Sequence, residues 1–250
     1  ERNYMLWTKS MFRREKSLVL TDLPDKIRQV NTCEITNRKE YMDAERDLIM
    51  YLQKYKDADD DKIEKALRGE VMVRINILRQ ISARGKVRDV IEFVKDFREN
   101  GKKIILFCSL HEVVDQLKRY FPTAVSVTGR DSQDEKQRAV DAFQNNPKAD
   151  IIICSIKAAG VGLTLTASSN VAFVEFPWTY ADCCQCEDRA HRIGQKDSVT
   201  CYYFLGRRTI DEKVYRIIQE KKNIANAVTG STEDIEENIV DMVARIFDTD

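Results

Sequence analysis

From Gly101 onward, short apolar segments alternate with amphipathic ones, and this alternation constrains the fold more than any other feature of the chain. The apolar segments have the length of buried strands, and the amphipathic segments have helical spacing. We expect strands at KIILFC, AVSVT, DIIICS, VAFVEF and SVTCYYFL, and helices at HEVVDQLKRYF, DSQDEKQRAVDAFQ and TYADCCQCEDRAHR. Nearly continuous apolar strands separated by helices are typical of a parallel sheet covered on both faces. The sequence therefore predicts an α/β fold with ligand-binding loops at the carboxyl ends of its strands.

The residues on either side of this region are expected to be mainly helical. A strand is predicted over residues 27–35, and apolar residues at helical spacing follow over 38–84, interrupted by the acidic loop DADDD. A third helix over 87–99 is expected to end at Gly101. After the last strand, Thr209 is a suitable N-cap for a long helix, and the acidic tail beyond Gly230 carries apolar residues at helical spacing.

Composition excludes several classes of protein. No apolar run approaches the roughly 20 residues of a membrane helix, so no membrane partner is expected. The formal net charge is zero, which gives no overall attraction for nucleic acid. The seven cysteines lack framework spacing, which indicates reduced thiols in an intracellular protein, in a bacterial cytoplasm or nucleoid or in a nucleus. Cys183, Cys184 and Cys186 lack a second Cys/His pair at zinc spacing, so we expect helix packing there and predict no metal site.

The first segment that carries chemistry is CSIKAAGVGLTLTASSNV, residues 154–171. Gly160 and Gly162 stand in a loop of small and hydroxyl residues that follows a predicted strand. Glycines in such a loop let the backbone approach a phosphate or another backbone segment. Taken alone, the same pattern also fits an ordinary turn.

The second segment is QCEDRAHRIGQ, residues 185–195. Arg189 and Arg192 are three residues apart, so on a helix they would share one face. Two guanidinium groups on one face could hold a triphosphate and stabilise the charge that develops during phosphoryl transfer. The alternative is a solvated basic face paired locally with Glu187 and Asp188.

Together the two segments resemble motifs V and VI of superfamily-two helicases, and DRAHRIGQ resembles the SWI/SNF branch. KIILFCS is similar to motif IV, and SVTGRDSQDEKQRAVDAFQ to the block that follows it. Residues 13–28 resemble the hinge between the two lobes of that family, and LRQIS with Lys86 resembles the helical approach to the second lobe. The short lobe is most similar to the annealing-helicase branch and its bacterial relatives.

The resemblance implies a second RecA-like helicase lobe with helical additions. The expected organisation is an interlobe hinge and first strand over 1–37, a helical protrusion or brace over 38–100, the RecA-like lobe over 101–206, and C-terminal helices over 207–250. Arg189 and Arg192 match the arginine fingers of the family and should face the phosphates of ATP. Gln185 matches the glutamine of motif VI. Gly160 and Gly162 match the glycines of motif V, near the nucleotide and the DNA backbone.

The same resemblance implies contacts with the phosphates of duplex DNA. Amides, hydroxyls and an ammonium group can position DNA without reading its sequence. Trp178 matches a tryptophan beside the DNA groove, although it would serve equally well as a hydrophobic anchor. It is followed by Thr179 rather than by the Asn-Pro of many relatives, which puts its DNA contact in doubt. The residues expected to contact DNA are Ser109, Thr128, Gly129, Lys157, Thr164 and Trp178.

The chain lacks the parts that hold the nucleotide in such enzymes. None of its nine glycines has another glycine five residues later, so the Walker A loop G-x-x-x-x-G-K-[ST] is absent. No acidic pair ends an apolar strand as a Walker B pair should. We therefore expect ATP and Mg²⁺ to be held mainly by an N-terminal lobe preceding Glu1, and expect this fragment alone to be inactive and monomeric.

Three other functions were weighed. A non-catalytic interaction scaffold would have no need of two phosphate-facing arginines. An RNA-acting helicase, or an ATPase that recycles RNA polymerase, could use the same core. A Rossmann-type nucleotide enzyme needs a glycine-rich turn that leads into a helix, whereas GVG at 160–162 leads into LTLTASS. The sequence therefore favours an ATP-dependent translocase on double-stranded DNA.

Overall fold

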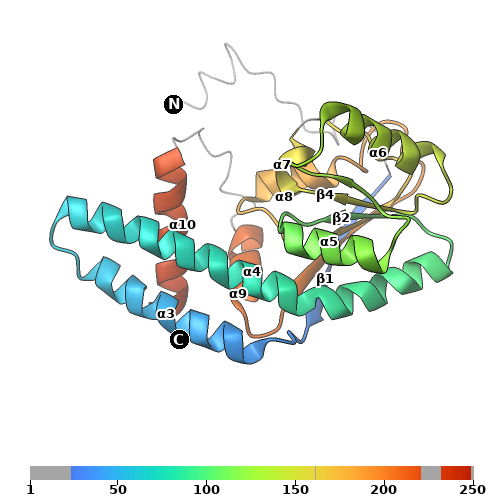
Figure 1. Ribbon diagram of the computed structural model, residues 1–250. Helices are drawn as coiled ribbons and strands as arrows, with labels where there is room; N and C mark the ends of the chain where they lie inside the picture. Colours follow the sequence, from blue (N-terminus) through green and yellow to red (C-terminus); the bar gives the residue numbers. More distant parts are fainter. Residues whose placement is uncertain (1–23, 161, 221–231, 249–250) are drawn as a thin grey trace, which may run out of the picture.

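The computed structural model describes residues 24–160, 162–220 and 232–248, and its elements are labelled as in Figure 1. The described strands form one six-stranded parallel sheet in the order β1-β6-β5-β2-β4-β3. The strands are β1 (Lys26–Cys33), β2 (Ile104–Phe107), β3 (Val125–Val127), β4 (Ile151–Cys154), β5 (Asn170–Phe173) and β6 (Val199–Gly206). Each strand predicted from the sequence is present, and the α/β fold is confirmed.

Both faces of the sheet are buried, as the continuous apolar strands predict. Successive residues of β2 point to opposite faces: Ile105 and Phe107 belong to one apolar cluster, and Ile104 and Leu106 to the other. The second half of α4 (Asp61–Glu99) and α5 (His111–Tyr120) contribute to the cluster that contains Ile104. The opposite cluster receives α6 (Gln133–Asn145), α8 (Tyr180–Glu187) and α9 (Ile210–Glu220). The core therefore consists of two layers separated by the sheet.

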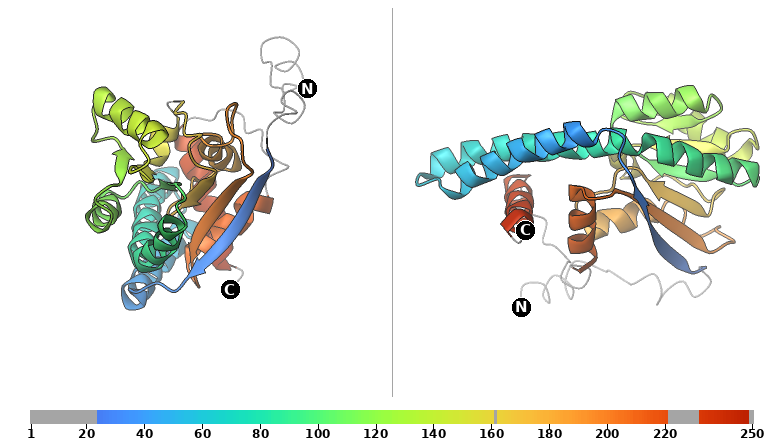
Figure 2. Two further views of the ribbon diagram at one scale, coloured as in Figure 1. Left: turned by 90° about the vertical axis from the view of Figure 1, so that its right-hand side faces the viewer. Right: turned by 90° about the horizontal axis from the view of Figure 1, so that it is seen from below.

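A long helical hairpin extends from the sheet. α3 (Arg38–Lys56) runs back along the first part of α4, and Figure 2 shows both projecting beyond the strands. The acidic turn between them matches the predicted loop, and Asp60 caps α4 through its carboxylate. The expected third helix is wrong as a separate element, because α4 continues through Gly85 to Glu99. The predicted end at Gly101 is confirmed, since Gly101 has a φ of +66°.

The glycine at position 85 serves packing and does not end the helix. A Cβ atom there would lie 2.3 Å from the side-chain oxygen of Asn37 and 2.6 Å from Cβ of Ile35. The segment between β1 and α3 therefore packs directly on the α4 backbone, and the Thr36 amide donates to the Gly85 carbonyl. The close approach of this segment requires a glycine at position 85.

Two helices complete the described chain. α9 begins after Thr209, whose hydroxyl accepts from the Asp211 amide, so the predicted N-cap is confirmed. The rest of the helix expected there lies outside the described residues. α10 (Thr232–Asp248) packs against α4, burying Ile239, Val243 and Ile246 among others. No described helix is both long and apolar enough to cross a membrane. The domain boundaries stay a prediction, although β1 shares one sheet with the strands of 101–206.

Candidate functional site

The two candidate arginines lie in a loop, which corrects the expectation that they share a helical face. α8 ends at Glu187, and residues 188–195, named here the arginine loop, continue as turns and bends. A tertiary contact holds this irregular backbone, since the Arg189 carbonyl accepts from the Leu165 amide at 2.9 Å. The two side chains are therefore positioned by contacts across the fold rather than by helical periodicity.

The arginine loop packs directly against residues 160 and 162–165, named here the glycine segment. One Arg192 nitrogen, Nη1, donates to the carbonyls of Gly162 at 3.3 Å and Leu163 at 3.0 Å. Gly162 has a φ of +76°, a backbone conformation that favours glycine, and a Cβ atom there would lie 3.9 Å from Nη1 of Arg189. The structure thus brings together Gly162, Arg189 and Arg192, from segments that are almost 30 residues apart.

Neither arginine of the pair forms an ion pair within the described chain, and the charge of Asp188 offsets only part of the burial and repulsion that act on Arg189. No carboxylate of the described residues lies within 4 Å of either guanidinium group, and the hydrogen bonds of both groups go to backbone carbonyls. Nε of Arg189 donates a hydrogen bond to the Gln185 carbonyl at 3.0 Å, while the Gln185 side chain is exposed. Burial and the neighbouring charge of Arg192 lower the pKa of Arg189. Two adjacent cations that disfavour each other form a site that favours an anion.

Glu187, the local partner considered for these arginines, is engaged elsewhere. Its carboxylate is fully buried and accepts two hydrogen bonds from Arg28, at 2.7 and 2.8 Å. Lys26 lies 3.1 Å from it, and the Tyr203 hydroxyl donates to it at 3.0 Å. Burial would raise the pKa of Glu187, but the hydrogen bond from Arg28 and the two positive charges outweigh it, so its pKa is lowered.

A second group of candidates lies at the carboxyl edge of the sheet. The Ser109 amide, just after β2, donates to Oε2 of Glu175 at 2.7 Å, and the Leu110 amide does so at 2.8 Å. The Ser109 hydroxyl accepts from the Ile156 amide at 3.2 Å and keeps its own hydrogen for another acceptor. The Ser109 hydroxyl rather than its amide is therefore the group left for a phosphate. Glu175 is a residue that sequence reasoning did not single out.

The turn after β3 separates two residues that the sequence grouped together. Thr128 is buried, and both its amide and its hydroxyl donate to Oδ2 of Asp131, at 2.6 and 2.8 Å. Gly129 beside it is exposed, with no atom within 4 Å of where a Cβ would stand. Thr128 thus shapes the turn, whereas Gly129 is the backbone that a ligand could reach.

The segment after β4 connects the two groups. It was expected to be a loop, but it opens with the single helical turn α7 (Ile156–Ala159), capped by the Ser155 hydroxyl. Lys157, Gly160 and Thr164 are exposed along it. The segment starts beside Ser109 and continues to the backbone that binds Arg192, so it adjoins both groups.

Trp178 is half-buried against the apolar core. The guanidinium carbon of Arg79, from α4, lies 4.2 Å from the centre of its ring, and Arg79 also donates to the Phe176 carbonyl. Burial lowers the pKa of Arg79. These contacts favour the anchoring role that was weighed for Trp178, and its contact with DNA stays a prediction.

The arginine loop does not lie at the carboxyl edge, where the general rule for such sheets directs attention. His191 places Nε2 2.6 Å from the Pro24 carbonyl, immediately before β1. Gln195 donates to the carbonyls of Ser168, Thr166 and Ala190, and Ser168 in turn donates to the Lys103 carbonyl, immediately before β2. Both contacts are at the amino ends of strands. Gln195 belongs to the motif read in the sequence, but its residue type did not indicate that it would be buried and bound to three backbone carbonyls.

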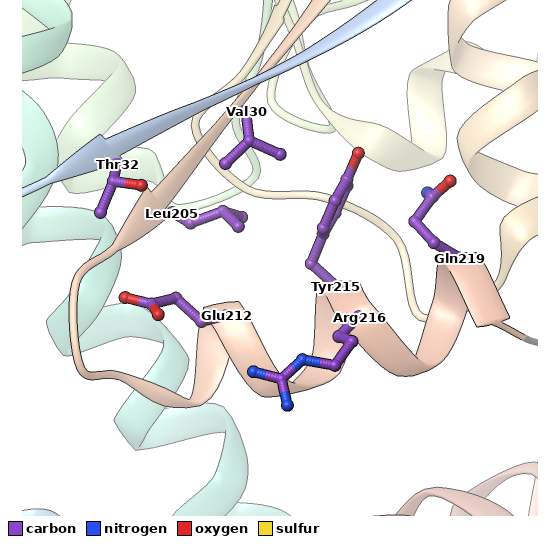
Figure 3. Close-up of a pocket in the computed structure, with 7 residues that line it drawn as sticks. All are labelled: Val30, Thr32, Leu205, Glu212, Tyr215, Arg216 and Gln219. Atoms are coloured by element: carbon purple, nitrogen blue, oxygen red, sulfur yellow. The ribbon is translucent and has the colours of Figure 1, made fainter.

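The cysteines of α8 and a pocket beside β1 are two further features of the structure. Cys183 and Cys186 are buried in the apolar core, and no metal-binding cluster of three or more His, Cys, Asp or Glu side chains occurs in the described ranges. A wide, open pocket of about 500 Å³ lies on the surface between β1, β6 and α9. Figure 3 shows its lining residues, none of which is a candidate from the sequence: Val30, Thr32, Leu205, Glu212, Tyr215, Arg216 and Gln219.

Comparisons with known proteins show a helicase domain in this chain and similar sequences in other proteins. The family described as helicase conserved C-terminal domain matches residues 85–194. The chain is 30% identical over 218 residues to a SWI/SNF-related matrix-associated actin-dependent regulator of chromatin subfamily A-like protein 1 from Xenopus tropicalis, covering 84% of this chain and 22% of that protein. It is 30% identical over 239 residues to the DNA annealing helicase and endonuclease ZRANB3 from Homo sapiens, covering 92% and 21%. The chain thus spans about a fifth of the length of these relatives.

Solved structures support the fold. The Sulfolobus solfataricus SWI2/SNF2 ATPase core in complex with dsDNA superimposes with a TM-score of 0.68 at 22% identity, covering 97% of this chain and 55% of that one. The six-stranded parallel sheet with its covering helices is therefore RecA-like. The match to the helicase domain includes α7, the glycine segment and nearly all of the arginine loop. Together these similarities support an SNF2-type, superfamily-two helicase C-terminal lobe.

Proposed function

We propose that this lobe supplies two arginine fingers to the ATPase site of a translocase that moves along double-stranded DNA. One observation carries the proposal. Arg189 and Arg192 are adjacent and lack a carboxylate partner among the described residues, and backbone carbonyls hold both side chains: that of Gln185 for Arg189, and those of Gly162 and Leu163 for Arg192. Such a pair is oriented before any ligand arrives and is left with unbalanced positive charge.

The phosphates of ATP fit this pair. Guanidinium groups present several donors in a plane, which suits phosphate oxygens, and each retains donors that no described group uses. ATP supplies the phosphoryl group whose transfer to water develops negative charge. Closure of two lobes would bring Arg189 and Arg192 to that charge, where their contribution is electrostatic.

The missing parts of the site belong to an upstream lobe in this proposal. The sequence holds no Walker A loop, and residues 1–250 correspond to about a fifth of their relatives. Mg²⁺ and most phosphate contacts would come from that lobe, so this chain alone would not hydrolyse ATP. We propose that the whole protein acts as a monomer.

Contacts with one DNA strand would come from the carboxyl edge. The Ser109 hydroxyl, the exposed backbone at Gly129, and the exposed side chains of Lys157 and Thr164 offer donors suited to phosphate oxygens. The segment 155–165 adjoins both this edge and the arginines, so a shift driven by ATP could move these contacts along the strand. A dsDNA complex of a structural relative supports duplex DNA as the substrate.

The test is the DNA-stimulated ATPase activity of the parent protein, with its upstream lobe, bearing Arg192→Ala. We expect kcat to fall by about 10³-fold or more, because a finger stabilises the transition state. Arg192→Lys should restore little, because lysine lacks the planar group whose remaining nitrogens could bind a phosphate while Nη1 stays on the carbonyls of Gly162 and Leu163. Arg46→Ala, on the exposed face of α3, is the matched control and should leave kcat unchanged.

A near-normal rate for Arg192→Ala, in a protein that still melts and binds DNA as the wild type does, would disprove the assignment. Activity of residues 1–250 alone would disprove the two-lobe arrangement. Comparing duplex DNA, single strands and RNA as stimulators tests the substrate. Stronger stimulation by RNA would favour the alternative of an RNA-acting helicase.

A further inference from the structure

The arginine loop is fastened to the first strand of the sheet by a buried ionic cluster. Glu187, directly before the loop, has no exposed surface, and both its carboxylate oxygens bind Arg28 of β1, at 2.7 and 2.8 Å. Lys26 of the same strand lies 3.1 Å from Glu187 and 3.8 Å from Asp188. Two side chains of β1 therefore reach the residues on either side of the point where α8 becomes the loop.

A second contact fastens the loop one turn later. Nε2 of His191 lies 2.6 Å from the Pro24 carbonyl, which can only accept, so Nε2 carries the hydrogen. The backbone beside it is paired as well, because the Val199 amide donates to the Asp25 carbonyl. The loop is thus held at residues 187 and 191 by the segment 24–28, with both arginines beside these fixed points.

The geometry of the cluster fixes the orientation of Glu187 relative to Arg28, in addition to the attraction between their charges. Arg28 presents its planar fork to both oxygens of Glu187, an arrangement that fixes direction as well as distance. Its guanidinium carbon also lies 4.9 Å from the centre of the Tyr180 ring, at the start of α8. One side chain of β1 therefore contacts both ends of α8, and a displacement of β1 would carry α8 and the start of the arginine loop with it.

We propose that Glu187 is a positioning residue that couples the segment 24–28 to Arg189 and Arg192. In the sequence this segment follows residues 13–23, the part that leads from the upstream lobe under the proposed function, on which this inference rests. The connection between the lobes would then also set the position of the fingers. The path runs from Arg28 to Glu187, along the loop to Arg189, and on to Leu165.

A purely structural role predicts something different, and the chain offers a control for it. Asp211 is a second buried carboxylate, and it accepts hydrogen bonds from Lys86 at 2.8 Å and from the Ser82 hydroxyl at 2.7 Å. Among the described residues, no hydrogen bond or ion pair joins Asp211 to the arginine loop. Neutralising either carboxylate should lower the melting temperature, but only the loss of Glu187 should disturb the arginines.

The experiment compares Glu187→Gln, Asp211→Asn and wild type in the parent protein, well below the melting temperature of each variant. For Glu187→Gln we expect kcat of DNA-stimulated ATP hydrolysis to fall on the order of 10²-fold, the effect of misplacing a catalytic group by about 1 Å. KM for ATP and the affinity for duplex DNA should change little. Asp211→Asn should keep the wild-type kcat.

Combining variants tests whether Glu187 acts through the arginines. If it does, Glu187→Gln should cause no further loss of kcat in a protein that already carries Arg192→Ala. A full additional loss would overturn the proposal, and so would a normal kcat for Glu187→Gln. If Glu187→Gln fails to fold, Arg28→Lys replaces it, because lysine keeps the positive charge but lacks the planar guanidinium group. Arg28→Lys should still lower kcat, and a normal kcat for this variant would also overturn the coupling.

The outcomes separate this inference from the function on which it rests. If Arg192→Ala hydrolyses ATP normally, the finger assignment fails, and the coupling fails with it. If Arg192→Ala is inactive while Glu187→Gln and Arg28→Lys turn over normally, the fingers stand and only the coupling is lost. Hydrogen exchange of the amides in residues 188–195 adds a direct readout, which should accelerate in Glu187→Gln and not in Asp211→Asn.

Discussion

Glu187 and Asp211 are two buried carboxylates with similar chemistry in different parts of the fold. Each is paired with a cation from a distant part of the sequence, Arg28 for Glu187 and Lys86 for Asp211, and each also accepts from a buried hydroxyl. The surroundings differ. Glu187 joins an edge strand to the start of an irregular loop, whereas Asp211 joins the long helix α4 to the start of α9.

The Asp211 cluster fastens layers of regular structure. The ammonium group of Lys86 donates to Asp211 and to the carbonyls of Val174 and Phe204, so all three of its hydrogens are used. Asp211 also accepts from the Gly206 amide. These partners lie at the ends of β5 and β6, so the cluster fixes α4 against the sheet. Its elements would be regular without it.

The Glu187 cluster fastens backbone that has no regular pattern of its own. The hydrogen bonds within the arginine loop are those of turns, and its position also depends on contacts with the segment 24–28 and with residues 162–168. A similar buried pair therefore has a different consequence at each place. The Asp211 cluster holds α4 against the sheet, whereas the Glu187 cluster also sets the position of Arg189 and Arg192.

The largest difference between the clusters should appear when the cation is removed. Lys86→Met leaves Asp211 buried without its partner, and loss of one member of a buried pair costs about 3–5 kcal/mol of unfolding free energy. Urea denaturation of the lobe measures this, with Lys95→Met on the exposed face of the same helix as the control. The kcat of the parent protein should be unchanged while it stays folded. A large fall in kcat would show that the two clusters do not differ as proposed.

Acidification should lower the unfolding free energy through both clusters. The decrease should be smaller than that caused by removing the cation, because a protonated carboxyl group keeps part of its hydrogen bonding. Burial would raise the pKa values of Asp211 and Glu187, but their cationic partners lower both. A carboxylate with a lowered pKa stabilises the fold fully above its unfolded pKa, here 3.8 for Asp and 4.5 for Glu. That stability is lost as pH falls through the lower folded value.

Urea denaturation from about pH 6 down to about pH 3 measures the acid effect. The unfolding free energy should decrease below the unfolded pKa values and should decrease less steeply in Glu187→Gln and Asp211→Asn. If the two variants are as sensitive to acid as the wild type, the buried pairs are not its source. As the pH falls, the amides of the arginine loop should also lose protection against hydrogen exchange, relative to their intrinsic rates, before those of the core do.

The smallest effect should come from removing one hydroxyl from each cluster. Tyr203→Phe deletes a hydrogen bond to Glu187, and Ser82→Ala deletes one to Asp211. Each should cost about 1.5 kcal/mol, the lower range for a hydrogen bond to a charged group, because the other donors remain. Only Tyr203→Phe should also lower kcat. Equal kcat values for the two variants would indicate that Glu187 tolerates small displacements without affecting the arginines.

Much of the fold could be predicted because it follows from local pattern. The apolar strands and their helices appear where periodicity placed them, and Ser132 and Glu135 form a capping box at the start of α6. The misplaced elements have a common physical cause. α4 continues through Gly85, where residues 35–37 pack so closely on the helix that no side chain would fit. α8 stops before Arg189, because contacts with distant segments hold the loop that follows it.

The candidate site was predicted as a set of residues but not as an arrangement. Gly162, Arg189 and Arg192 were selected together, and the structure joins them. Glu175 and Gln195 were missed, because a glutamate after a strand and a glutamine after a glycine carry no signal until their partners are known. Their roles depend on amides and carbonyls that are remote in the sequence.

The sequence by itself determined the parallel α/β architecture, the family motifs and the absence of a Walker A loop, since these depend on residue type and on spacing along the chain. Only the tertiary structure decided that the two arginines lie in a loop, that Thr128 is turned inward, and that Glu187 binds Arg28 instead of its neighbours. The physical reason is that a buried charge or polar group must find a partner wherever the fold offers one. Periodicity reports which face of an element is apolar, but it does not report which distant group will meet a given side chain.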